Sequence, residues 1–316
     1  MWNIPDDLYL LALAVLIDLL VGEPPARFHP TVWIGRTVAW ADRLSPREGG
    51  RGLLAGALAV VAITTLWAGA AYFAAWGLQE AHSLAYILAG AALLKTTFAV
   101  RMLHRVAARV RRLLAQDDMD QVRANMASLV SRDTAQLTAE QATSATVESV
   151  SENMSDSFIG PWLAFAFFGL PGAFAYRAIN TLDSMIGYHG SYEYLGKAAA
   201  RLDDLINLMP ARLCGLLLVA ASFLLPGQRG VGAWRIMWRD RGHTQSPNAG
   251  WTMSGMAGAL GVQLEKVSPQ GGYRLGDPAR PVEPRDITRS IQSMYLVAAL
   301  GLVIALGLIY LRDGIF

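Results

Sequence analysis

Two uninterrupted apolar runs constrain the fold of this chain more than any other feature. Residues 53–78 and 291–311 form runs of 26 and 21 residues that contain no charged side chain. A helix needs about 20 residues to cross the hydrocarbon core of a bilayer, so both runs predict membrane-spanning helices. The composition agrees, because only 16% of the residues are charged, against about 25% in a typical soluble domain. We therefore expect an all-α, polytopic integral membrane protein.

Composition also excludes several classes of function. The formal net charge is only +2, so the chain lacks the strongly basic character of proteins that bind nucleic acid. A single cysteine, Cys214, rules out an internal disulfide and any site built on a Cys-x-x-Cys pair. The sequence also lacks the P-loop and the dinucleotide-binding glycine motif. Any nucleotide that this chain binds must therefore be held in another way.

The remaining apolar segments are shorter or interrupted. Residues 84–100 contain Lys95 near their end, where its side chain could snorkel to the membrane surface. Residues 8–21 are shorter, glycine and proline interrupt residues 158–175, and residues 213–225 number only 13. Broken segments persist at membrane depth only where protein or a water-filled cavity covers the backbone. We predict re-entrant or half-spanning helices around a polar cavity, with tilted full spans as the alternative.

The long segments between the apolar runs carry most of the Lys and Arg residues. Residues 22–52, 101–157 and 227–290 contain five, seven and nine of them. Cytoplasmic loops of membrane proteins are enriched in these residues. We predict that these three segments are cytoplasmic loops, that the polar cavity faces the cytoplasm, and that residues 1–316 form one domain embedded in the lipid of the cell membrane.

Acidic side chains recur every four residues in the polar segment 138–157, which is predicted to be helical. The positions are Glu140, Ser144, Glu148, Glu152 and Asp156. This spacing predicts one helix face, on which like charges repel, and the sequence has no Lys or Arg between Asp133 and Arg177. Carboxylates suit Mg²⁺, so Glu148, Glu152 and Asp156 are candidate ligands. The alternatives are a solvated acidic face and pairing with arginines from elsewhere in the fold.

A second polar cluster follows the interrupted apolar segment. Asn180 and Asp183 lie three residues apart, and Asp203, Asp204 and Asn207 repeat the pattern at helical spacing. These groups could hold a second ion or a metal–phosphate unit. Nearby basic residues could contact phosphate oxygens; they are Lys197, Arg201 and Arg212. Ordinary ion pairing within the cluster is the alternative.

Two loops have turn chemistry that could present polar side chains. Asp18 lies near the end of a candidate membrane helix and is a functional candidate, with snorkelling as the alternative. His29 precedes a proline, which keeps it out of the helical region. Ser246 and Asn248 belong to a turn that is expected to cap a helix from Trp251 to Val262.

The start of that helix could hold an anionic group. Arg239, Arg241 and His243 lie upstream of it. Gly255, Gly258 and Gly261 are expected to form a close-packing face of the helix. A purely structural cap and a tight helix contact would account for the same residues.

These motifs, taken together and in this order, resemble the CobD/CbiB family, the adenosylcobinamide-phosphate synthases of cobalamin biosynthesis. The resemblance extends from about Asp18 to Tyr273. It is carried by Asp18 with Gly-Glu-Pro and Phe-His-Pro at 22–30, Arg-Asp-Thr at 132–134, Val-Glu-Ser, Ser-Glu-Asn and Asp within 147–156, Asn-Thr-Leu-Asp-Ser-Met-Ile-Gly-Tyr at 180–188, Ala-Arg-Leu-Asp-Asp, Asn and Pro-Ala-Arg within 200–212, and Ser-Pro-Asn-Ala-Gly at 246–250.

The resemblance implies a membrane-bound ligase. It would join a propionate carboxylate of adenosylcobyric acid to the amine of (R)-1-aminopropan-2-ol, or of its O-phosphate, and consume Mg²⁺–ATP. ATP would convert the carboxylate to an acyl phosphate that the amine attacks. Other enzymes of the corrinoid pathway are further candidate partners.

Within that reaction the candidate residues take roles. Glu148, Glu152 and Asp156 would bind Mg²⁺–ATP, and Asp183, Asp203, Asp204 and Asn207 would hold a second ion or orient groups. Phosphate charge would be stabilised by Arg177, Lys197, Arg201 and Arg212, with Asn180 beside them, and substrate would be bound by His29, Ser246 and Asn248. Asp183, Asp156 and His243 are the candidates for the base that takes the proton of the amine.

Two other classes of function fit parts of the sequence. Asn180-x-x-Asp183 and Asp203-Asp204-x-x-Asn207 are similar to the Mg²⁺–diphosphate motifs of membrane prenyltransferases. A distant branch of the resembling family, represented by AmpE, suggests a membrane sensor or signalling protein without enzymatic activity. Dependence on a prenyl diphosphate would indicate the first, and absence of corrinoid-dependent ATP turnover would indicate the second.

Overall fold

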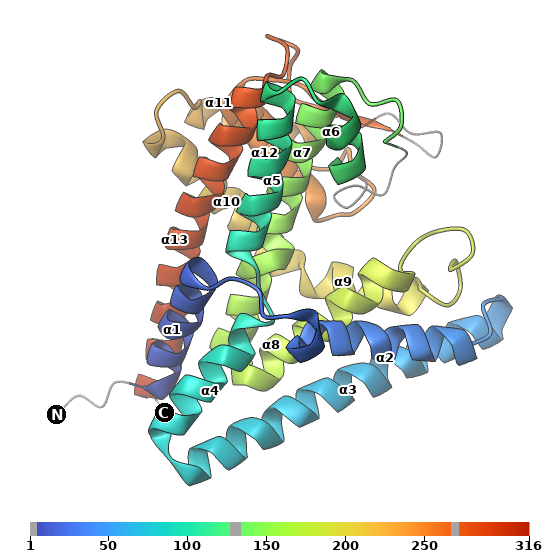
Figure 1. Ribbon diagram of the computed structural model, residues 1–316, viewed down its shortest axis with the longest axis vertical. Coiled ribbons are helices and arrows are strands. Elements are labelled where there is room, and N and C mark those ends of the chain that lie inside the picture. The colour runs from blue at the N-terminus through green and yellow to red at the C-terminus, as the bar shows by residue number, and fades with distance from the viewer. Residues whose placement is uncertain (1–4, 127–133, 267–271, 316) are drawn as a thin grey trace. The chain divides into compact units, whose positions relative to one another are not determined.

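The protein is almost entirely helical (Figure 1). The computed structural model describes residues 5–126, 134–266 and 272–315. Its helices are α1 (Asp6–Leu20), η1 (Ala26–Phe28), α2 (Pro30–Leu44), α3 (Gly49–Ala81), α4 (Ser83–Lys95), α5 (Val100–Ala115), α6 (Met119–Met126), α7 (Ala139–Met154), the π-helical turn η2 (Ser155–Ile159), α8 (Gly160–Ile186), α9 (Lys197–Ile206), α10 (Leu208–Leu224), α11 (Gly230–Asp240), α12 (Ala249–Leu260) and α13 (Pro284–Ile315). Strands β1 (Leu264–Lys266) and β2 (Tyr273–Leu275) form a short antiparallel pair. The predicted all-α class is confirmed.

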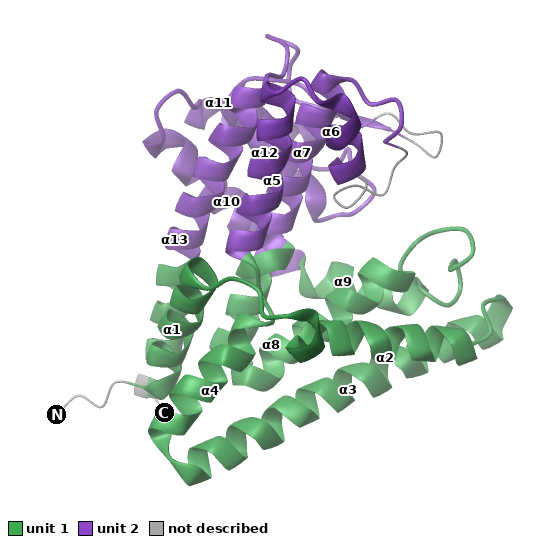
Figure 2. Ribbon diagram, in the orientation of Figure 1, with its two compact units in different colours: residues 1–99, 156–207, 302–316 green, residues 100–155, 208–301 purple. Residues whose placement is uncertain are grey.

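The chain divides into two compact units (Figure 2). Unit 1 comprises residues 1–99, 156–207 and 302–316, and unit 2 comprises residues 100–155 and 208–301. Each unit is therefore assembled from segments that are far apart in the sequence. The division does not test whether residues 1–316 form a single membrane-embedded domain, which stays a prediction.

Four helical stretches of the described residues are long and apolar enough to cross a membrane. They are Gly49–Ala81, Ser83–Ala115, Ala139–Ile186 and Pro284–Asp313, with a fifth if the bent pair Lys197–Ile206 and Leu208–Leu224 is counted as one span. The two long apolar runs of the sequence lie in the first and last of them, so these predicted spans are confirmed in length and composition. Helix α1 has only 15 residues and is too short to be counted.

Helix α3 shows why the chain needs an apolar solvent. Only 17% of its most apolar window is buried inside the structure. The side chains of Leu58, Val61 and Phe73 are 61%, 65% and 67% exposed. Contiguous exposed apolar surface of this extent marks an interaction surface, and the length of the helix matches a bilayer. Lipid around α3 accounts for both observations.

The interrupted apolar segment folds back on itself at Gly169, inside α8. Gly169 has φ +63°, a conformation that glycine adopts without strain. A Cβ atom added at Gly160 would overlap the ring of Tyr176, and one added at Gly172 would overlap the carbonyl oxygen of Ala164. These pairs are placed symmetrically about the break, so the two arms of α8 run side by side. The predicted break is confirmed, and its re-entry into a membrane stays a prediction.

Helix α12 is the packing centre of unit 2 and contacts α7, α10 and α11. The predicted helix from Trp251 to Val262 is confirmed, with bounds of Ala249 and Leu260. A Cβ atom added at Gly258 would overlap the carbonyl oxygen of Gly232 on α11. The predicted close-packing role of glycine is therefore confirmed at Gly258, where two backbones touch.

The three segments predicted to be cytoplasmic contain helices α2, α5, α6, α7, α11 and α12, of which the sequence indicated only α7 and α12. Helix α5 shows the reason. Its face with Val100, Leu103 and Val110 is buried, while arginines occupy much of the rest, so its average hydropathy hides a stable amphipathic helix. The cytoplasmic placement of these segments remains a prediction.

Candidate functional site

Lys95 is the centre of a buried ion network in unit 1. Its Nζ lies 2.9 Å from Asp18 Oδ1 and 2.7 Å from Glu23 Oε1, and the Lys95 and Asp18 side chains are 2% and 0% exposed. Helix α1 packs against α4, and this contact brings Asp18 to the end of α4 where Lys95 lies. The hypothesis that Lys95 snorkels was therefore wrong. Its charge is neutralised inside the protein, as a buried charge requires.

His29 extends this network through Glu23. His29 Nε2 lies 2.8 Å from Glu23 Oε2, and His29 Nδ1 is buried without a hydrogen-bond partner among the described residues. Burial of the Glu23 carboxyl group acts to raise its pKa, but hydrogen bonds from His29 and Lys95 outweigh burial and hold the pKa below the ordinary value. Glu23 is therefore ionised at neutral pH and orients the His29 ring.

The second polar cluster of the sequence forms a hydrogen-bonded chain between α8 and α9. Arg177 Nη1 donates to Asn180 Oδ1 at 3.2 Å, and Asn180 Nδ2 donates to Asp203 Oδ1 at 3.4 Å. Asn207 Nδ2 donates to Asp203 Oδ2 at 2.9 Å, and the Tyr176 hydroxyl donates to Asn207 Oδ1. The structure thus brings together Arg177, Asn180, Asp203 and Asn207, as the sequence predicts.

Arg177 interacts electrostatically with two carboxylates of unit 1. The charges of both Glu23 and Asp156 act on its guanidinium group. Its Nε is buried without a hydrogen-bond partner in the part of the chain that the structure describes. A buried donor of this kind is available to a bound anion, which agrees with the predicted phosphate-binding role.

The other predicted residues of unit 1 lie at the edge of this chain of bonds. Asp183 follows Asn180 by one turn, and its side chain lies over Gly187. Asp204 is half-buried next to Asp203, while the side chains of Lys197 and Arg201 are exposed. The α9 cations are thus accessible from outside unit 1, and their phosphate-binding role stays a prediction.

The acidic residues of α7 do not share one environment. Glu148 is buried and accepts hydrogen bonds from Ser144 Oγ at 2.8 Å and from the Tyr273 hydroxyl at 2.8 Å. Glu140 and Glu152 are exposed. Residues of an α-helix are about 100° apart, so each step of four overshoots a full turn by about 40° and the stripe winds around the helix. The prediction of a single face was wrong over this length.

Positive charge reaches this acidic segment from the β1–β2 pair. The charge of Lys266 on β1 acts on Glu152, which also feels the charge of Glu148. This is the kind of compensation by a distant basic residue that the sequence left open. Glu148 and Glu152 belong to unit 2, whereas Asp156 belongs to unit 1.

The metal ligands remain predicted. Residues 5–126, 134–266 and 272–315 contain no group of three or more His, Cys, Asp or Glu side chains arranged to hold a metal ion. The candidate donors are all carboxylate or amide oxygens, the chemistry that Mg²⁺ prefers, and Mg²⁺ commonly binds through one or two carboxylates plus substrate phosphates. The donor chemistry therefore fits Mg²⁺.

Arg212 and Asn248, both predicted from sequence, meet in unit 2. Arg212 Nη1 donates to Asn248 Oδ1 at 2.5 Å and to the Leu208 carbonyl at 3.1 Å. Ser246 Oγ accepts from the Asn248 backbone N–H at 3.2 Å. Asn248 is the residue before α12, yet its side chain makes no capping hydrogen bond. The turn thus presents its side chain to an arginine instead of to the helix end.

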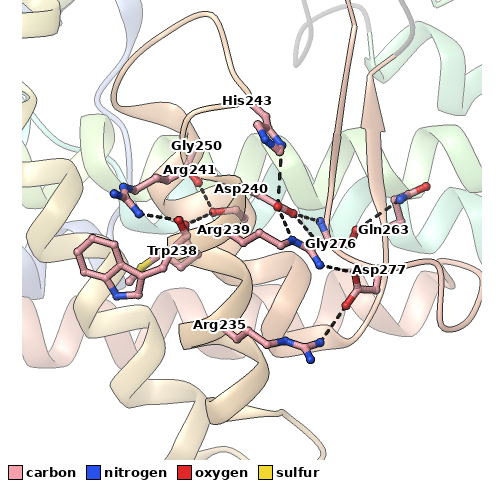
Figure 3. Close-up of polar contacts among 12 residues, drawn as sticks. Arg235, Trp238, Arg239, Asp240, Arg241, His243, Gly250, Gln263, Gly276 and Asp277 are labelled. Carbon is pink, nitrogen blue, oxygen red and sulfur yellow. Dashed lines mark hydrogen bonds and ion pairs between the residues drawn. The ribbon is translucent and has the colours of Figure 1, made fainter.

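Asp240, at the end of α11, organises the neighbouring loop (Figure 3). Arg239 donates to Asp240 through Nε at 2.6 Å and Nη2 at 2.9 Å, and the Gly276 backbone N–H donates at 2.7 Å. Burial acts to raise the pKa of Asp240, but these hydrogen bonds outweigh it and leave the pKa below the ordinary value. His243, a predicted base, is exposed and places Nδ1 3.9 Å from Asp240 Oδ1.

Several residues of these networks were missed by sequence reasoning. They are Tyr176, Asp240, Trp251, Lys266 and Tyr273, and Lys95 was noticed but placed wrongly. Tyr176 had a usable signal, because it directly precedes Arg177 in a polar helical stretch. Asp240 directly follows its partner Arg239, whereas Trp251, Lys266 and Tyr273 acquire their partners only through packing. Arg132 and Asp133 of the predicted Arg-Asp-Thr motif lie outside the described residues.

The fold and these networks define a class: a helical membrane protein whose interior holds paired ionisable side chains. Such groups are rare within apolar helices and mark functional sites. Comparison with known proteins gives the family. The chain matches the CobD/Cbib protein family over residues 11–294, and it therefore belongs to the CobD/CbiB family.

Relatives match over nearly the full length of both chains. The cobalamin biosynthesis protein CobD of Dehalococcoides mccartyi is 44% identical over 96% of this chain and 98% of its own. The probable cobalamin biosynthesis protein CobD of Methanothermobacter thermautotrophicus is 40% identical over 96% and 98%. The cobalamin biosynthesis protein CbiB of Salmonella choleraesuis is 37% identical over 92% and 94%. No solved structure matches the chain.

Proposed function

We propose that this protein acts in cobalamin biosynthesis as the ligase that attaches aminopropanol to the corrinoid. It joins a propionate carboxylate of adenosylcobyric acid to the amine of (R)-1-aminopropan-2-ol or its O-phosphate, with Mg²⁺–ATP as co-substrate. The observation that carries the proposal is similarity along the whole chain to relatives named for cobalamin biosynthesis. The bonded chain from Arg177 to Asn207 supports it, because it joins a cation, two amides and a carboxylate at one place.

The proposed chemistry divides into two steps that balance. A carboxylate oxygen attacks the γ-phosphorus of ATP, and ADP leaves. The amine nitrogen then attacks the acyl carbon, and phosphate leaves as the amide forms. Phosphoryl transfer depends mainly on positioning and on stabilisation of charge, which Arg177, Arg201 and Arg212 are suited to supply.

Mg²⁺ would reduce the charge of the phosphates when bound. Glu148 and Glu152 are the proposed Mg²⁺ ligands within unit 2, and Asp156, Asp203, Asp204 and Asn207 are those within unit 1. The amine must lose a proton before it attacks, and Asp156, Asp183 and His243 are the proposed acceptors. Of these, His243 is exposed, and its Nδ1 lies 3.9 Å from the carboxylate of Asp240.

The family match favours this function over the two alternatives. A prenyltransferase would use the two acid-rich motifs around Asp183 and Asp203, but it gives no role to the Ser-Pro-Asn-Ala-Gly turn or to α7. A sensor without catalysis gives no reason for both polar clusters. Dependence of turnover on a corrinoid separates the proposed ligase from both alternatives.

The test is reconstitution of the reaction. The full chain in detergent is incubated with adenosylcobyric acid, Mg²⁺–ATP and either aminopropanol or its phosphate, and the amide is sought by mass spectrometry. We expect product with at least one amine. Glu152→Gln should abolish turnover, whereas Glu140→Gln, an exposed carboxylate on the same helix, should not. Corrinoid binding without product from either amine would contradict the ligase.

A further inference from the structure

Two arginines of unit 2 contact the same tryptophan, Trp251, and have no carboxylate partner among the described residues. Arg212 bonds to Asn248 Oδ1 and the Leu208 carbonyl, and Arg241 donates to the Trp238 carbonyl at 2.6 Å. Both guanidinium groups stack on the Trp251 indole, with Cζ 5.0 Å and 5.1 Å from the ring centroid. The charge of Arg241 acts on Arg212.

Several other arginines of the same unit are paired with carboxylates. Arg239 contacts Asp240 and Asp277, Arg235 contacts Asp277, and Arg280 contacts Asp286. Figure 3 shows that the Arg241 side chain points away from Asp240, towards Trp238. Unit 2 therefore supplies carboxylates, but not to these two cations. Two like charges that contact one tryptophan and repel each other favour a bound anion, which would reduce their repulsion.

The positive charge around Arg212 and Arg241 favours an anion with more than one negative charge. The two arginines carry two positive charges, and α12 begins beside them with no side-chain cap on its first backbone N–H groups, which favour negative charge. A single carboxylate would leave the place positive. A phosphate monoester carries about two negative charges at neutral pH, and a polyphosphate chain carries more. Arginine forks also match phosphate oxygens in geometry.

Aromatic surface adjoins the two cations. The Trp238 and Trp251 rings are edge to face at 5.2 Å, and the Trp238 and Trp234 rings at 5.5 Å. Trp234 and Trp238 are 47% and 40% exposed, and Arg241 lies 4.2 Å from the Trp238 ring centroid. An exposed indole can stack on any nucleobase. A ligand that combines a flat base with a phosphate chain uses both parts of this surface.

We propose that Arg212, Arg241 and Asn248 bind the phosphate chain of a nucleoside triphosphate, with its base on Trp238. This inference rests on the proposed function, which requires ATP, and it supplies a nucleotide site in a chain without a P-loop. A lipid headgroup shares the phosphate chemistry, and tryptophan and arginine also gather at membrane surfaces. The lipid composition is therefore one variable of the test.

The test measures binding by the full chain in nanodiscs of zwitterionic lipid, by calorimetry with ATP and with tripolyphosphate. Arg212→Gln and Arg241→Gln should each raise the Kd of both ligands by about ten- to a hundred-fold, as expected for loss of a charge-assisted hydrogen bond. The Kd of Arg212→Lys should lie between those of the wild type and Arg212→Gln. Trp238→Leu should weaken ATP but not tripolyphosphate. Arg235 is an exposed arginine of α11 with a carboxylate partner, and Arg235→Gln should change the Kd of neither ligand. Thermal unfolding checks the fold of each variant.

Wild-type affinity for ATP in both arginine variants would overturn the proposal. So would the absence of ATP binding in zwitterionic discs together with arginine-dependent binding of anionic lipid, which would assign the place to a headgroup. The proposed function can fail separately. If the wild-type protein binds ATP through these arginines but forms no amide, the nucleotide site is supported and the ligase activity is contradicted.

Discussion

The buried charges of unit 1 and the arginine pair of unit 2 differ in how their charge is balanced. In unit 1, Lys95 lies between the carboxylates of Asp18 and Glu23, both within 3 Å. In unit 2, Arg212 and Arg241 have only neutral oxygen atoms and the indole rings of Trp238 and Trp251 for partners among the described residues. The first arrangement is complete without a ligand, whereas the second becomes balanced when an anion binds.

This difference separates two uses of charge in one chain. A buried pair removed from water must be neutralised internally, since an unpaired charge there is costly. A half-exposed arginine remains hydrated and tolerates a like-charged neighbour, at the expense of some stability. Substitutions in the Lys95 network of unit 1 should therefore affect folding, and substitutions at the unit 2 arginines should affect binding.

The largest expected effect is in the unit 1 network. Lys95→Met removes the buried cation that contacts Asp18 and Glu23, which should cost about 3–5 kcal/mol of the free energy of unfolding. Thermal unfolding in detergent measures the loss. The matched control is Asp18→Asn with Lys95→Met, which removes both charges and should recover much of the stability. Equal loss in the single and double variants would contradict internal neutralisation.

A smaller effect is expected in the bonded chain between α8 and α9. Asp203→Asn turns one acceptor oxygen into a donor that faces the amide of Asn180 or Asn207, and an unsatisfied buried group costs about 1–3 kcal/mol. Asp120, whose side chain is 97% exposed, provides the control: Asp120→Asn should leave the unfolding temperature unchanged. If the two variants unfold alike, Asp203 is not part of a buried network.

The smallest effect concerns acid stability in unit 2. The pKa of Asp240 is held below its ordinary value of 3.8, so its carboxylate stabilises the folded state fully above that pH. The contribution is lost as pH falls through the lower folded pKa. Asp240→Asn should therefore be less stable than wild type at pH 7, with the difference closing only in strong acid. A difference that is independent of pH would contradict this linkage.

Much of the fold could be predicted from sequence because many of the helices depend on local patterns of apolar and polar residues. The long apolar runs predicted α3 and α13, and the polar segment after Thr138 predicted α7. The glycine and proline residues of segment 158–175 predicted a break, which the structure has at Gly169. Amphipathic α5 was missed, because its arginines lower the average hydropathy while its buried face stays apolar. Local composition thus finds helices that face lipid more readily than helices that face other helices.

The site could be predicted only where partners are close in sequence or share a motif. Asn180, Asp203 and Asn207 were expected together and lie together. Lys95 pairs with Asp18, which is 77 residues away, and Lys266 acts on Glu152 from a strand that the sequence did not indicate. Which distant residue neutralises a given charge is decided by helix packing, and no local pattern records it.

The central claim, amide formation driven by ATP, is tested most directly by following the oxygen atoms of the corrinoid carboxylate. Adenosylcobyric acid labelled with oxygen-18 in that carboxylate is incubated with the full chain, Mg²⁺–ATP and the amine. The account predicts the corrinoid amide together with one labelled oxygen in the released phosphate. Label in AMP would contradict the phosphoryl step, and the absence of both amide and labelled phosphate would contradict the ligase itself.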